Sequence, residues 1–261
     1  MSKPKRVQYK RSLICHLDLL GFRELIRNKN PGEISRVLRL FSNAVTPVKR
    51  GFQVKELATK QFVAFSDTHV TVIPTEPKDS SARGLIFLQI LRLVHAQWLL
   101  FFEHKILVRG GIVVGDAVRS YGRFFGQGII DAYDVESQKA LYPRIVVDAS
   151  VFEELKNNPK VWTHDDDPDA EIKAVKGLLH HDEENGVYYI DYLRVMEGEF
   201  DYPEVYPQYL EDYLDKIREL MAETTHPGAH SKLEWMKRYR RRVLRAMQPR
   251  APKPAPRVRQ K

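Results

Sequence analysis

The chain has 261 residues, with 42 Lys and Arg against 34 Asp and Glu, and a net charge of +8. Its apolar content of 43% supports a sizeable core, which excludes wholesale disorder, and its length predicts one domain or a small two-domain chain. Residues 1–11 and 237–261 hold sixteen basic residues and no acids, whereas residues 12–236 hold 26 basic and 34 acidic residues. The body is therefore acidic, and the net charge does not predict a nucleic-acid-binding domain.

A single cysteine, Cys15, excludes a disulfide framework and indicates a reducing compartment, so we expect a cytoplasmic protein. No continuous apolar segment with a small-residue cleavage site follows the basic N-terminus, and we therefore expect no signal peptide. The most apolar stretch, 84–102, is interrupted by Gln89, Arg92 and two further polar residues. We expect a buried amphipathic helix there rather than a membrane span.

Hydrophobic periodicity and turn residues predict the elements in chain order. In the first half they are a strand over 12–20, helices over 22–29 and 32–46, a strand over 52–58, a hairpin over 61–74 that turns at Ser66-Asp67-Thr68, a long helix capped by Ser80 or Ser81 and ending near 103, and a strand over 106–114. In the second half they are a helix over 127–139, a strand over 144–147, a helix over 150–157, an acidic loop over 164–171, strands over 172–177 and 187–193, and helices over 208–222 and 229–247.

This order of elements predicts an α+β fold, in which helices cover a sheet of the ferredoxin-like, split-βαβ kind. We expect a basic tail over 1–11, a globular domain over 12–195 and a helical extension over 196–247. The Pro- and Arg-rich segment 248–261 has nothing to bury, so we expect it to be disordered.

Two aspartates interrupt apolar strands, Asp18 near the end of the first strand and Asp67 at the hairpin tip. A carboxylate in such a place is costly unless it is solvated, paired or bound to a metal. Each aspartate alone fits an ordinary role, Asp18 as a helix cap and Asp67 as a turn residue. The pair favours a metal site, because the topology can bring a strand end and a hairpin tip together, and Mg²⁺ and Mn²⁺ prefer carboxylate oxygens.

Gly21 and Phe22 follow Asp18 at the predicted junction of strand and helix. A glycine at this junction lets backbone N–H groups approach a phosphate, and the N-terminal end of a helix favours an anion. The alternative is a routine turn in which the glycine supplies a positive φ. A metal pair beside an anion-binding turn is the minimal equipment for phosphoryl transfer.

Four segments occur in a characteristic order: HLDLLGF (16–22), FSD (65–67), RGGIVVGDAV (109–118) and FGQGIIDAYDVES (125–137). They resemble the two metal motifs, the Arg-x-Gly-Ile strand and the dimer-face helix of the class III adenylyl and guanylyl cyclases. The resemblance covers about 12–195 and implies a nucleotidyl cyclase-type catalytic domain of ferredoxin-like fold, followed by C-terminal helices.

The resemblance implies two-metal catalysis with two Mg²⁺ or Mn²⁺ ions per site, in which the ribose 3′-oxygen attacks the α-phosphorus and pyrophosphate leaves. The residues implied to carry this chemistry are the metal ligands Asp18, Asp67 and the Leu19 carbonyl, and the phosphate contacts Arg109 and the backbone amides of Leu20, Gly21 and Phe22. For Arg109 the alternative is an exposed charge on a strand. The resemblance also implies a homodimer and a separate effector that responds to the cyclic nucleotide.

The chain departs from the purine cyclases of this family at four positions. Val63 and Arg123 stand at about the positions of the Lys and Asp that read a purine base, and Ile130 and Asp134 stand where an Asn and an Arg stabilise the ribose and the transition state. This pattern resembles the pyrimidine cyclases of bacterial anti-phage Pycsar systems. Tyr121 and Arg123 are then candidates for base binding, because Tyr stacks on bases and Arg donates to pyrimidine carbonyls; ordinary loop residues are the equal alternative.

We therefore expect a pyrimidine cyclase, with UTP favoured over CTP and a cyclic product that acts as a second messenger. Two other classes stay open. A degenerate cyclase fold that binds nucleotide without turnover fits Ile130 and Asp134, and basic tails are able to contact nucleic acid nonspecifically. For the domain itself we expect neither a membrane span nor nucleic acid as a partner.

Overall fold

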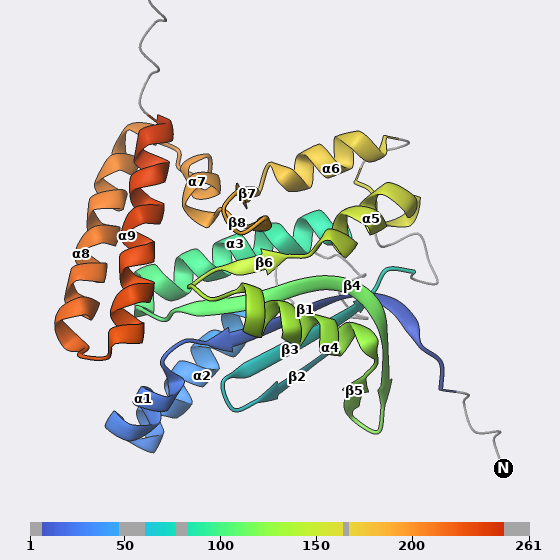
Figure 1. The fold of residues 1–261 in the computed structure, drawn as a ribbon, viewed down its shortest axis with the longest axis horizontal. Coiled ribbons are helices and arrows are strands. Elements are labelled where there is room, and N and C mark those ends of the chain that lie inside the picture. Colours follow the sequence, from blue (N-terminus) through green and yellow to red (C-terminus); the bar gives the residue numbers. More distant parts are fainter. Residues whose placement is uncertain (1–6, 47–60, 77–82, 164–166, 248–261) are drawn as a thin grey trace, which may run out of the picture. The chain divides into compact units, whose positions relative to one another are not determined.

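A computed structural model of the chain describes residues 7–46, 61–76, 83–163 and 167–247 (Figure 1). By its internal contacts the chain divides into two compact units, 1–201 and 202–261. The division falls six residues after the boundary expected at 195. Lys10 and Arg11, expected in the N-terminal tail, already belong to the first strand.

The first unit contains one mixed sheet with the strand order β2-β3-β1-β4-β6-β8-β7, and β5 pairs with β4 beside this path. Its strands are β1 (Lys10–Leu19), β2 (Gln61–Phe65), β3 (Thr68–Pro74), β4 (Val108–Ser120), β5 (Arg123–Phe125), β6 (Ile145–Val147), β7 (Leu179–Asp182) and β8 (Val187–Ile190). Its α-helices are α1 (Phe22–Asn28), α2 (Pro31–Val45), α3 (Leu85–His104), α4 (Gln127–Asp134), α5 (Ala149–Asn157), α6 (Pro168–Lys176) and α7 (Tyr192–Glu197). A π-helical turn, Val135–Lys139, continues α4, and a 3₁₀ turn, Pro159–Val161, follows α5.

The first four strands have the split-βαβ arrangement. β1 lies between β3 and β4 and is antiparallel to both, and β2 is antiparallel to β3. Among the described residues, α1 and α2 lie between β1 and β2 in the chain and α3 lies between β3 and β4, which gives the ferredoxin-like order. The predicted α+β class is therefore confirmed, and β6, β8 and β7 extend the sheet beyond β4.

Helices cover both faces of the central strand β1, whose residues 12–17 are all buried. Cys15 accepts a hydrogen bond from Gln89 of α3 at 3.7 Å, and the neighbouring His16 packs edge-on against Tyr133 of α4, with ring centroids 5.6 Å apart. Because successive side chains of a strand point to opposite faces, α3 and α4 lie on opposite sides of the sheet (Figure 1).

Among the described residues, α3 is the one helix long and apolar enough to cross a membrane, with a mean hydropathy of 1.7. Within the molecule, 61% of that apolar window is buried. α2 lies on the same face of the sheet, where Phe41 packs edge-on against His69 of β3. α3 therefore has the environment of a core helix, as its interrupted apolar pattern predicted.

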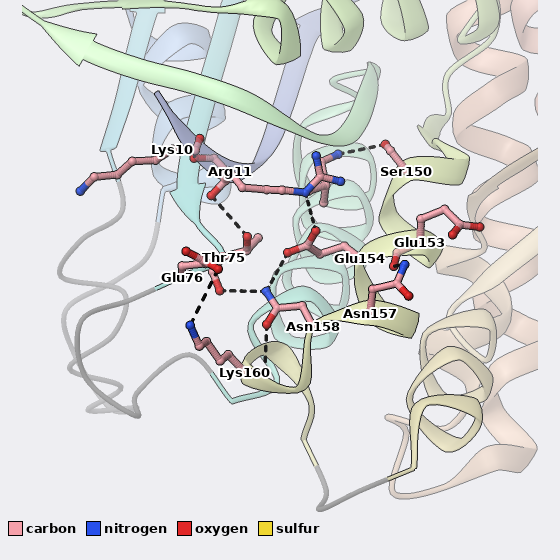
Figure 2. A network of polar contacts seen from close by, with 12 residues as sticks. Lys10, Arg11, Thr75, Glu76, Ser150, Glu153, Glu154, Asn157, Asn158 and Lys160 are labelled. Atoms are coloured by element: carbon pink, nitrogen blue, oxygen red, sulfur yellow. Dashed lines mark hydrogen bonds and ion pairs between the residues drawn. The ribbon is translucent and has the colours of Figure 1, made fainter. Parts of the chain in front are cut away.

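A cluster of polar contacts fixes the start of β1, at the end of the strand opposite Asp18 (Figure 2). Glu154 of α5 accepts hydrogen bonds from Arg11 Nε and Asn158 Nδ2, both at 2.7 Å. The N–H of Thr75 donates to the carbonyl of Arg11 at 3.0 Å. Burial alone would raise the pKa of Glu154, but the hydrogen bonds from Asn158 and Arg11 lower it, so this carboxylate is ionised at neutral pH.

Glycines set the distance between α4 and β4. A Cβ at Gly111 of β4 would lie 2.5 Å from the carbonyl oxygen of Ala132, and a Cβ at Gly115 would lie 2.7 Å from Cα of Gly128. Both distances are shorter than any ordinary contact, so the helix backbone rests directly on the strand backbone. This approach also brings the turn after α4 against Gly111, because the same Cβ would lie 2.9 Å from the backbone nitrogen of Glu136.

The predicted strand over 187–193 ends at Ile190, because α7 begins at Tyr192. Two further segments differ from the sequence prediction. The predicted strand over 172–177 is wrong, because α6 spans Pro168–Lys176. The described part of the acidic run supplies a helix cap and a first helical turn: Asp167 accepts hydrogen bonds from the amides of Asp169 and Ala170, and Pro168 begins the helix. Residues 164–166 of the run lie outside the described residues.

The other difference is the length of β4, which runs past Gly115 to Ser120 and then pairs with β5. The glycines that indicated a strand end are instead the positions where α4 packs. The predicted strand 52–58, the caps Ser80 and Ser81, and the tail 248–261 lie outside the described residues.

The second unit contains a 3₁₀ turn, Pro203–Val205, and the helices α8 (Tyr206–Glu223) and α9 (Pro227–Met247). Apolar side chains at helical spacing are buried, namely Tyr206, Leu210, Tyr213 and Ile217 of α8 and Leu233, Met236, Tyr239 and Val243 of α9. Arg240 joins the two helices, because its Nε donates to the carbonyl of Leu210 at 2.6 Å and its guanidinium pairs with Glu211.

We expect Gly111→Ala to lower the free energy of unfolding by about 1–3 kcal/mol, because the added methyl forces α4 away from β4. Urea unfolding followed by circular dichroism measures this. Gly198→Ala is the matched control, since its Cβ would meet its nearest atom at 3.6 Å, an ordinary contact. Equal stability of the two variants would contradict the close packing described for Gly111.

Candidate functional site

The end of β1 and the β2–β3 turn lie side by side. Asp18 is opposite Thr68 of β3 and Arg109 of β4, and Asp67 occupies the turn between β2 and β3. The N–H of Leu19 donates to the backbone carbonyl of Asp67 at 3.2 Å, which holds the turn against the strand end. The structure thus places the two aspartates together, as the topology argument predicted; their role as metal ligands stays a prediction.

The carboxyl group of Asp18 is close enough to Asp67 to be affected by it. Burial raises the pKa of Asp18, and repulsion from Asp67 raises it further, while the hydrogen bond from Arg109 lowers it. The net direction is upward, so ionising Asp18 without a cation is unfavourable. A divalent cation bound to Asp18 would reverse that balance, because it favours the ionised form of the carboxyl group.

The donor atoms fit Mg²⁺ or Mn²⁺. Two carboxylates and the backbone carbonyl of Leu19 are hard oxygen ligands, which these ions prefer. Among the described residues, no three His, Cys, Asp or Glu side chains are grouped so that they could hold a metal. Mg²⁺ commonly binds through one or two carboxylates and completes its coordination with water and substrate phosphates. The residues therefore fit a metal centre that a phosphorylated substrate completes.

Arg109 lies between two acidic side chains. Its Nε donates to Asp18 Oδ2 at 3.1 Å and lies 2.7 Å from Glu136 Oε1. The Arg109 side chain is 25% exposed, which does not fit the alternative of a fully solvated strand charge. Arg109 therefore lies beside Asp18, which the sequence analysis did not predict, and its contact with a triphosphate stays a prediction.

Glu136 is a member of this cluster that the sequence reasoning missed. It lies in the π-helical turn after α4, and its side chain is 3% exposed. Burial raises its pKa, Arg109 lowers it, and repulsion from Asp18 and Asp67 raises it; the net direction is upward. Its spacing from the buried Ala132 is the signal that could have found it, because residues four apart share one helix face.

His16 lies next to Glu136 on the same side of the sheet. Its Nδ1 is 3.9 Å from Glu136 Oε2 and has no hydrogen-bond partner among the described residues. Burial and the nearby Arg109 charge lower the pKa of His16 to about 4, so the imidazole is neutral at pH 7. His16 therefore does not balance the charge of Glu136.

The turn after β1 has the form expected of an anion-binding turn only in part. Gly21 is exposed at φ 84°, which favours glycine, and a Cβ there would have nothing within 4 Å. The N–H of Leu20, however, donates to the carbonyl of Leu107 at 2.9 Å. The predicted phosphate-binding amides therefore narrow to those of Gly21 and Phe22. Because α1 has only seven residues, its dipole adds little.

The candidate base-binding residues are not close to Asp18 in the same chain. Tyr121 and Arg123 flank Gly122 in the β4–β5 turn, both are exposed, and the turn is at the far end of β4 (Figure 1). Arg109 and Tyr121 are twelve positions apart in the chain, roughly 35–40 Å for an extended strand. These two residues could approach a nucleotide at Asp18 only if that site belonged to another copy of the chain.

The other positions that depart from the purine cyclase pattern lie on two elements. Ile130 is on α4 and is 54% exposed. Asp134 ends α4 and accepts a hydrogen bond from Gln138 at 3.3 Å. Val63 is half-buried on β2, opposite Val70 of β3. None of the three offers the polar group that the purine cyclase pattern has at its position. Val63 and Ile130 are apolar, and Asp134 has a carboxylate where the pattern has an arginine.

No protein-family model matches the chain, and no curated protein matches it significantly. Solved structures similar to it include the adenylyl cyclase CyaB from P. aeruginosa, with 12% identity and a TM-score of 0.49 over 71% of this chain and 95% of that chain. They also include a bacterial light-regulated adenylyl cyclase, with 14% identity and a TM-score of 0.44 over 71% and 92%, and the guanylyl cyclase Cya2, with 16% identity and a TM-score of 0.40 over 70% and 92%. The likeness is one of fold alone.

We expect His16→Asn to make the protein less sensitive to acid. His16 has a pKa of about 4 in the folded protein against 6.5 in the unfolded chain, so the unfolded chain takes up the proton first. The stability associated with neutral His16 is complete above pH 6.5 and is lost as the pH falls toward 4, by about 3 kcal/mol.

Urea unfolding at pH 7.5 and 4.5 measures this loss. The difference between the two pH values should shrink in His16→Asn, and it should stay as in the wild type when the exposed His181 of β7 is replaced by Asn. Acidic groups such as Asp18 and Glu136 titrate in every variant, so the comparison isolates the histidine. An unchanged difference in His16→Asn would contradict the prediction.

Proposed function

We propose that this chain is a nucleotidyl cyclase that converts a pyrimidine nucleoside triphosphate into a 3′,5′-cyclic mononucleotide and pyrophosphate. The observation that carries the proposal is the convergence of Asp18 and Asp67, with Arg109 at 3.1 Å from Asp18 and the exposed Gly21 turn directly after β1. Two carboxylates, a cation and an open backbone turn are the groups that phosphoryl transfer requires.

The residues have distinct tasks in this reaction. Two Mg²⁺ or Mn²⁺ ions supply, when bound, a lower pKa for the ribose 3′-hydroxyl and positive charge for the phosphates. Asp18, Asp67 and the Leu19 carbonyl hold them. Arg109 and the amides of the Gly21–Phe22 turn hold the β- and γ-phosphates. The 3′-hydroxyl gives up its proton to water, its oxygen bonds to the α-phosphorus, the bond from that phosphorus to the bridging oxygen breaks, and pyrophosphate leaves with the electron pair.

A pyrimidine substrate is proposed because Val63 and Arg123 replace the purine-reading pair. Arg123 is a hydrogen-bond donor, and uracil presents two carbonyl oxygens to it where cytosine presents one, which favours UTP over CTP. Tyr121 offers an aromatic face for the base. By the resemblance to Pycsar cyclases, the product is a second messenger in anti-phage defence that acts on a separate effector protein.

The proposed site is shared between two copies of the chain. Tyr121 and Arg123 lie at the far end of β4 from Asp18, so a homodimer is the arrangement in which both sets reach one nucleotide. The exposed side of α4 is consistent with a homodimer, because Ile130 and Tyr133 are each 54% exposed. Neighbouring large apolar side chains that are exposed in one chain are often buried against a partner chain.

Incubation of the purified chain with each of the four nucleoside triphosphates and Mn²⁺ tests the activity, with products separated by chromatography. We expect cyclic UMP as the main product, and a loss of at least about a hundredfold in rate for Asp18→Asn and for Asp67→Asn, because each removes a metal ligand. Asp116→Asn, an exposed aspartate on β4, is the control that should keep the activity. Absence of any cyclic product would contradict the proposal.

Mixing two inactive variants tests the shared site. An equal mixture of Asp18→Asn and Arg123→Ala chains would form heterodimers with one intact site each, so about a quarter of the wild-type rate should return if dimers exchange freely. The mixture of Asp18→Asn with Asp67→Asn is the control, because both changes fall on the same half-site and no intact site can form. Equal rates of the two mixtures would place the base-binding residues elsewhere.

The second candidate is a nucleotide-binding module without turnover. It is favoured by Ile130 and Asp134, which stand where the cyclase pattern has groups that stabilise the ribose and the transition state. Calorimetry that shows Mn²⁺-dependent binding of UTP, together with the absence of any product from the four triphosphates, would favour this candidate over the cyclase.

A further inference from the structure

The Arg109 guanidinium is shared by two carboxylates in different surroundings. Asp18 is 17% exposed and lies beside the Asp67 turn, whereas Glu136 is 3% exposed and belongs to the π-helical turn that follows α4. Both contacts use the same nitrogen, Nε, which is 3.1 Å from Asp18 Oδ2 and 2.7 Å from Glu136 Oε1. Glu136 is thus as close to Arg109 as the candidate metal ligand is.

Glu136 depends on Arg109 for its charge balance. Within the described residues, Arg109 is the cation nearest to it, because Arg109 Nε lies 2.7 Å from Glu136 Oε1, whereas His16 Nδ1 lies 3.9 Å from Glu136 Oε2. A buried carboxylate is costly without a cation beside it, so the 2.7 Å contact between Glu136 Oε1 and Arg109 Nε favours keeping the guanidinium at this place.

Asp18 has a different relation to Arg109. A divalent cation that binds Asp18 and Asp67 competes with the guanidinium for the same carboxylate oxygens. When the cation displaces Arg109 from Asp18, the ion pair between Arg109 and Glu136 stays in place. The arginine is then released by one acid and retained by the other, at the edge of the metal centre.

The terminal nitrogens of Arg109 are a second set of donors. Both ion-pair distances, to Asp18 and to Glu136, start from Nε, and Arg109 makes no ion pair with another described residue. Arginine donates from all three nitrogens, and its terminal groups match the spacing of two phosphate oxygens. A substrate phosphate is therefore a partner that the terminal nitrogens can take while Nε stays beside Glu136.

We propose that Glu136 is a positioning residue that holds Arg109 at the metal centre, so that the arginine neutralises Asp18 before a metal binds and turns its terminal nitrogens to a substrate phosphate afterwards. The proposal rests on the proposed function, because it takes Asp18 and Asp67 as metal ligands. The backbone supports it: Gly111, two residues after Arg109, lets the Glu136 turn rest against β4.

Two dissociation constants of the purified full-length chain test this: that of Mn²⁺, from the electron paramagnetic resonance of the free ion, and that of inorganic tripolyphosphate at saturating Mn²⁺, from calorimetry. Glu136→Asp keeps the negative charge but is one methylene too short to keep its contact with Arg109. We expect it to weaken Mn²⁺ binding about fivefold, because Arg109 then pairs with Asp18 alone, and to weaken tripolyphosphate binding about tenfold.

Arg109→Met shows whether the effect passes through the arginine. In that background Glu136→Asp should change either constant by less than about twofold, because there is no guanidinium left to position. Glu153→Asp on α5, an exposed glutamate, is the control and should bind both probes as the wild type does. If Glu136→Asp does not fold, Glu136→Gln is measured instead, once in the wild-type background and once in the Arg109→Met background.

The outcomes separate this inference from the proposed function. If the wild type binds Mn²⁺, Asp18→Asn abolishes that binding, and Glu136→Asp leaves both constants unchanged, the positioning role is overturned and the metal centre stands. An effect of Glu136→Asp that is equally large with and without Arg109 also overturns it. If the wild type binds no Mn²⁺ that depends on Asp18, both the inference and the proposed cyclase are overturned.

Discussion

The contact between the backbones of α4 and β4 determines most of the site. Side chains usually separate the backbone of a helix from the backbone of the sheet beneath it. At this contact Gly111, Gly115 and Gly128 have no side chains, so the two backbones touch. The helix and its π-helical continuation therefore come close enough for Glu136 to reach Arg109 on the strand beneath. Without this approach the chain would still have two aspartates at the end of β1, but no buried acid to accompany the arginine.

The cluster that results is electrostatically unfavourable by itself. Three acids and one arginine lie at one end of the sheet, and the pKa values of Asp18 and Glu136 are raised by burial and by mutual repulsion. Groups with perturbed pKa values gather at functional sites because function, rather than stability, selects their arrangement. At the other end of β1 the carboxylate of Glu154 is fully paired by Arg11 and Asn158, and its pKa is lowered. The same strand is thus anchored at one end and left short of positive charge at the other.

The sequence was sufficient where local pattern decides the structure. The apolar run of β1 and the two-residue turn at Asp67 placed both aspartates, because strand and hairpin signals act over a few residues. Glu136 was missed because its burial follows from a long-range contact with Gly111, and the π-helical turn shifts the helical spacing. The glycines of β4 were taken for a strand end for the same reason: only the packed helix shows why they are needed. The strand predicted over 172–177 is part of the helix α6, because the N-terminal cap at Asp167 favours a helix more strongly than the weak strand pattern favours a strand.

Under the proposed function, the departures at Ile130 and Asp134 do not by themselves exclude turnover. In that pattern an arginine at the second position places positive charge on the transferring phosphate, and here that position is an acid. The charge then has to come from elsewhere in the same cluster. Under the proposed function Arg109 is the side chain in place to supply it, because its Nε contacts both Asp18 and Glu136 at this end of the sheet. A fixed arginine stabilises developing charge without reorganisation at the moment of reaction. On this reasoning, the absence of an arginine at position 134 is linked to the burial of Glu136 beside Arg109.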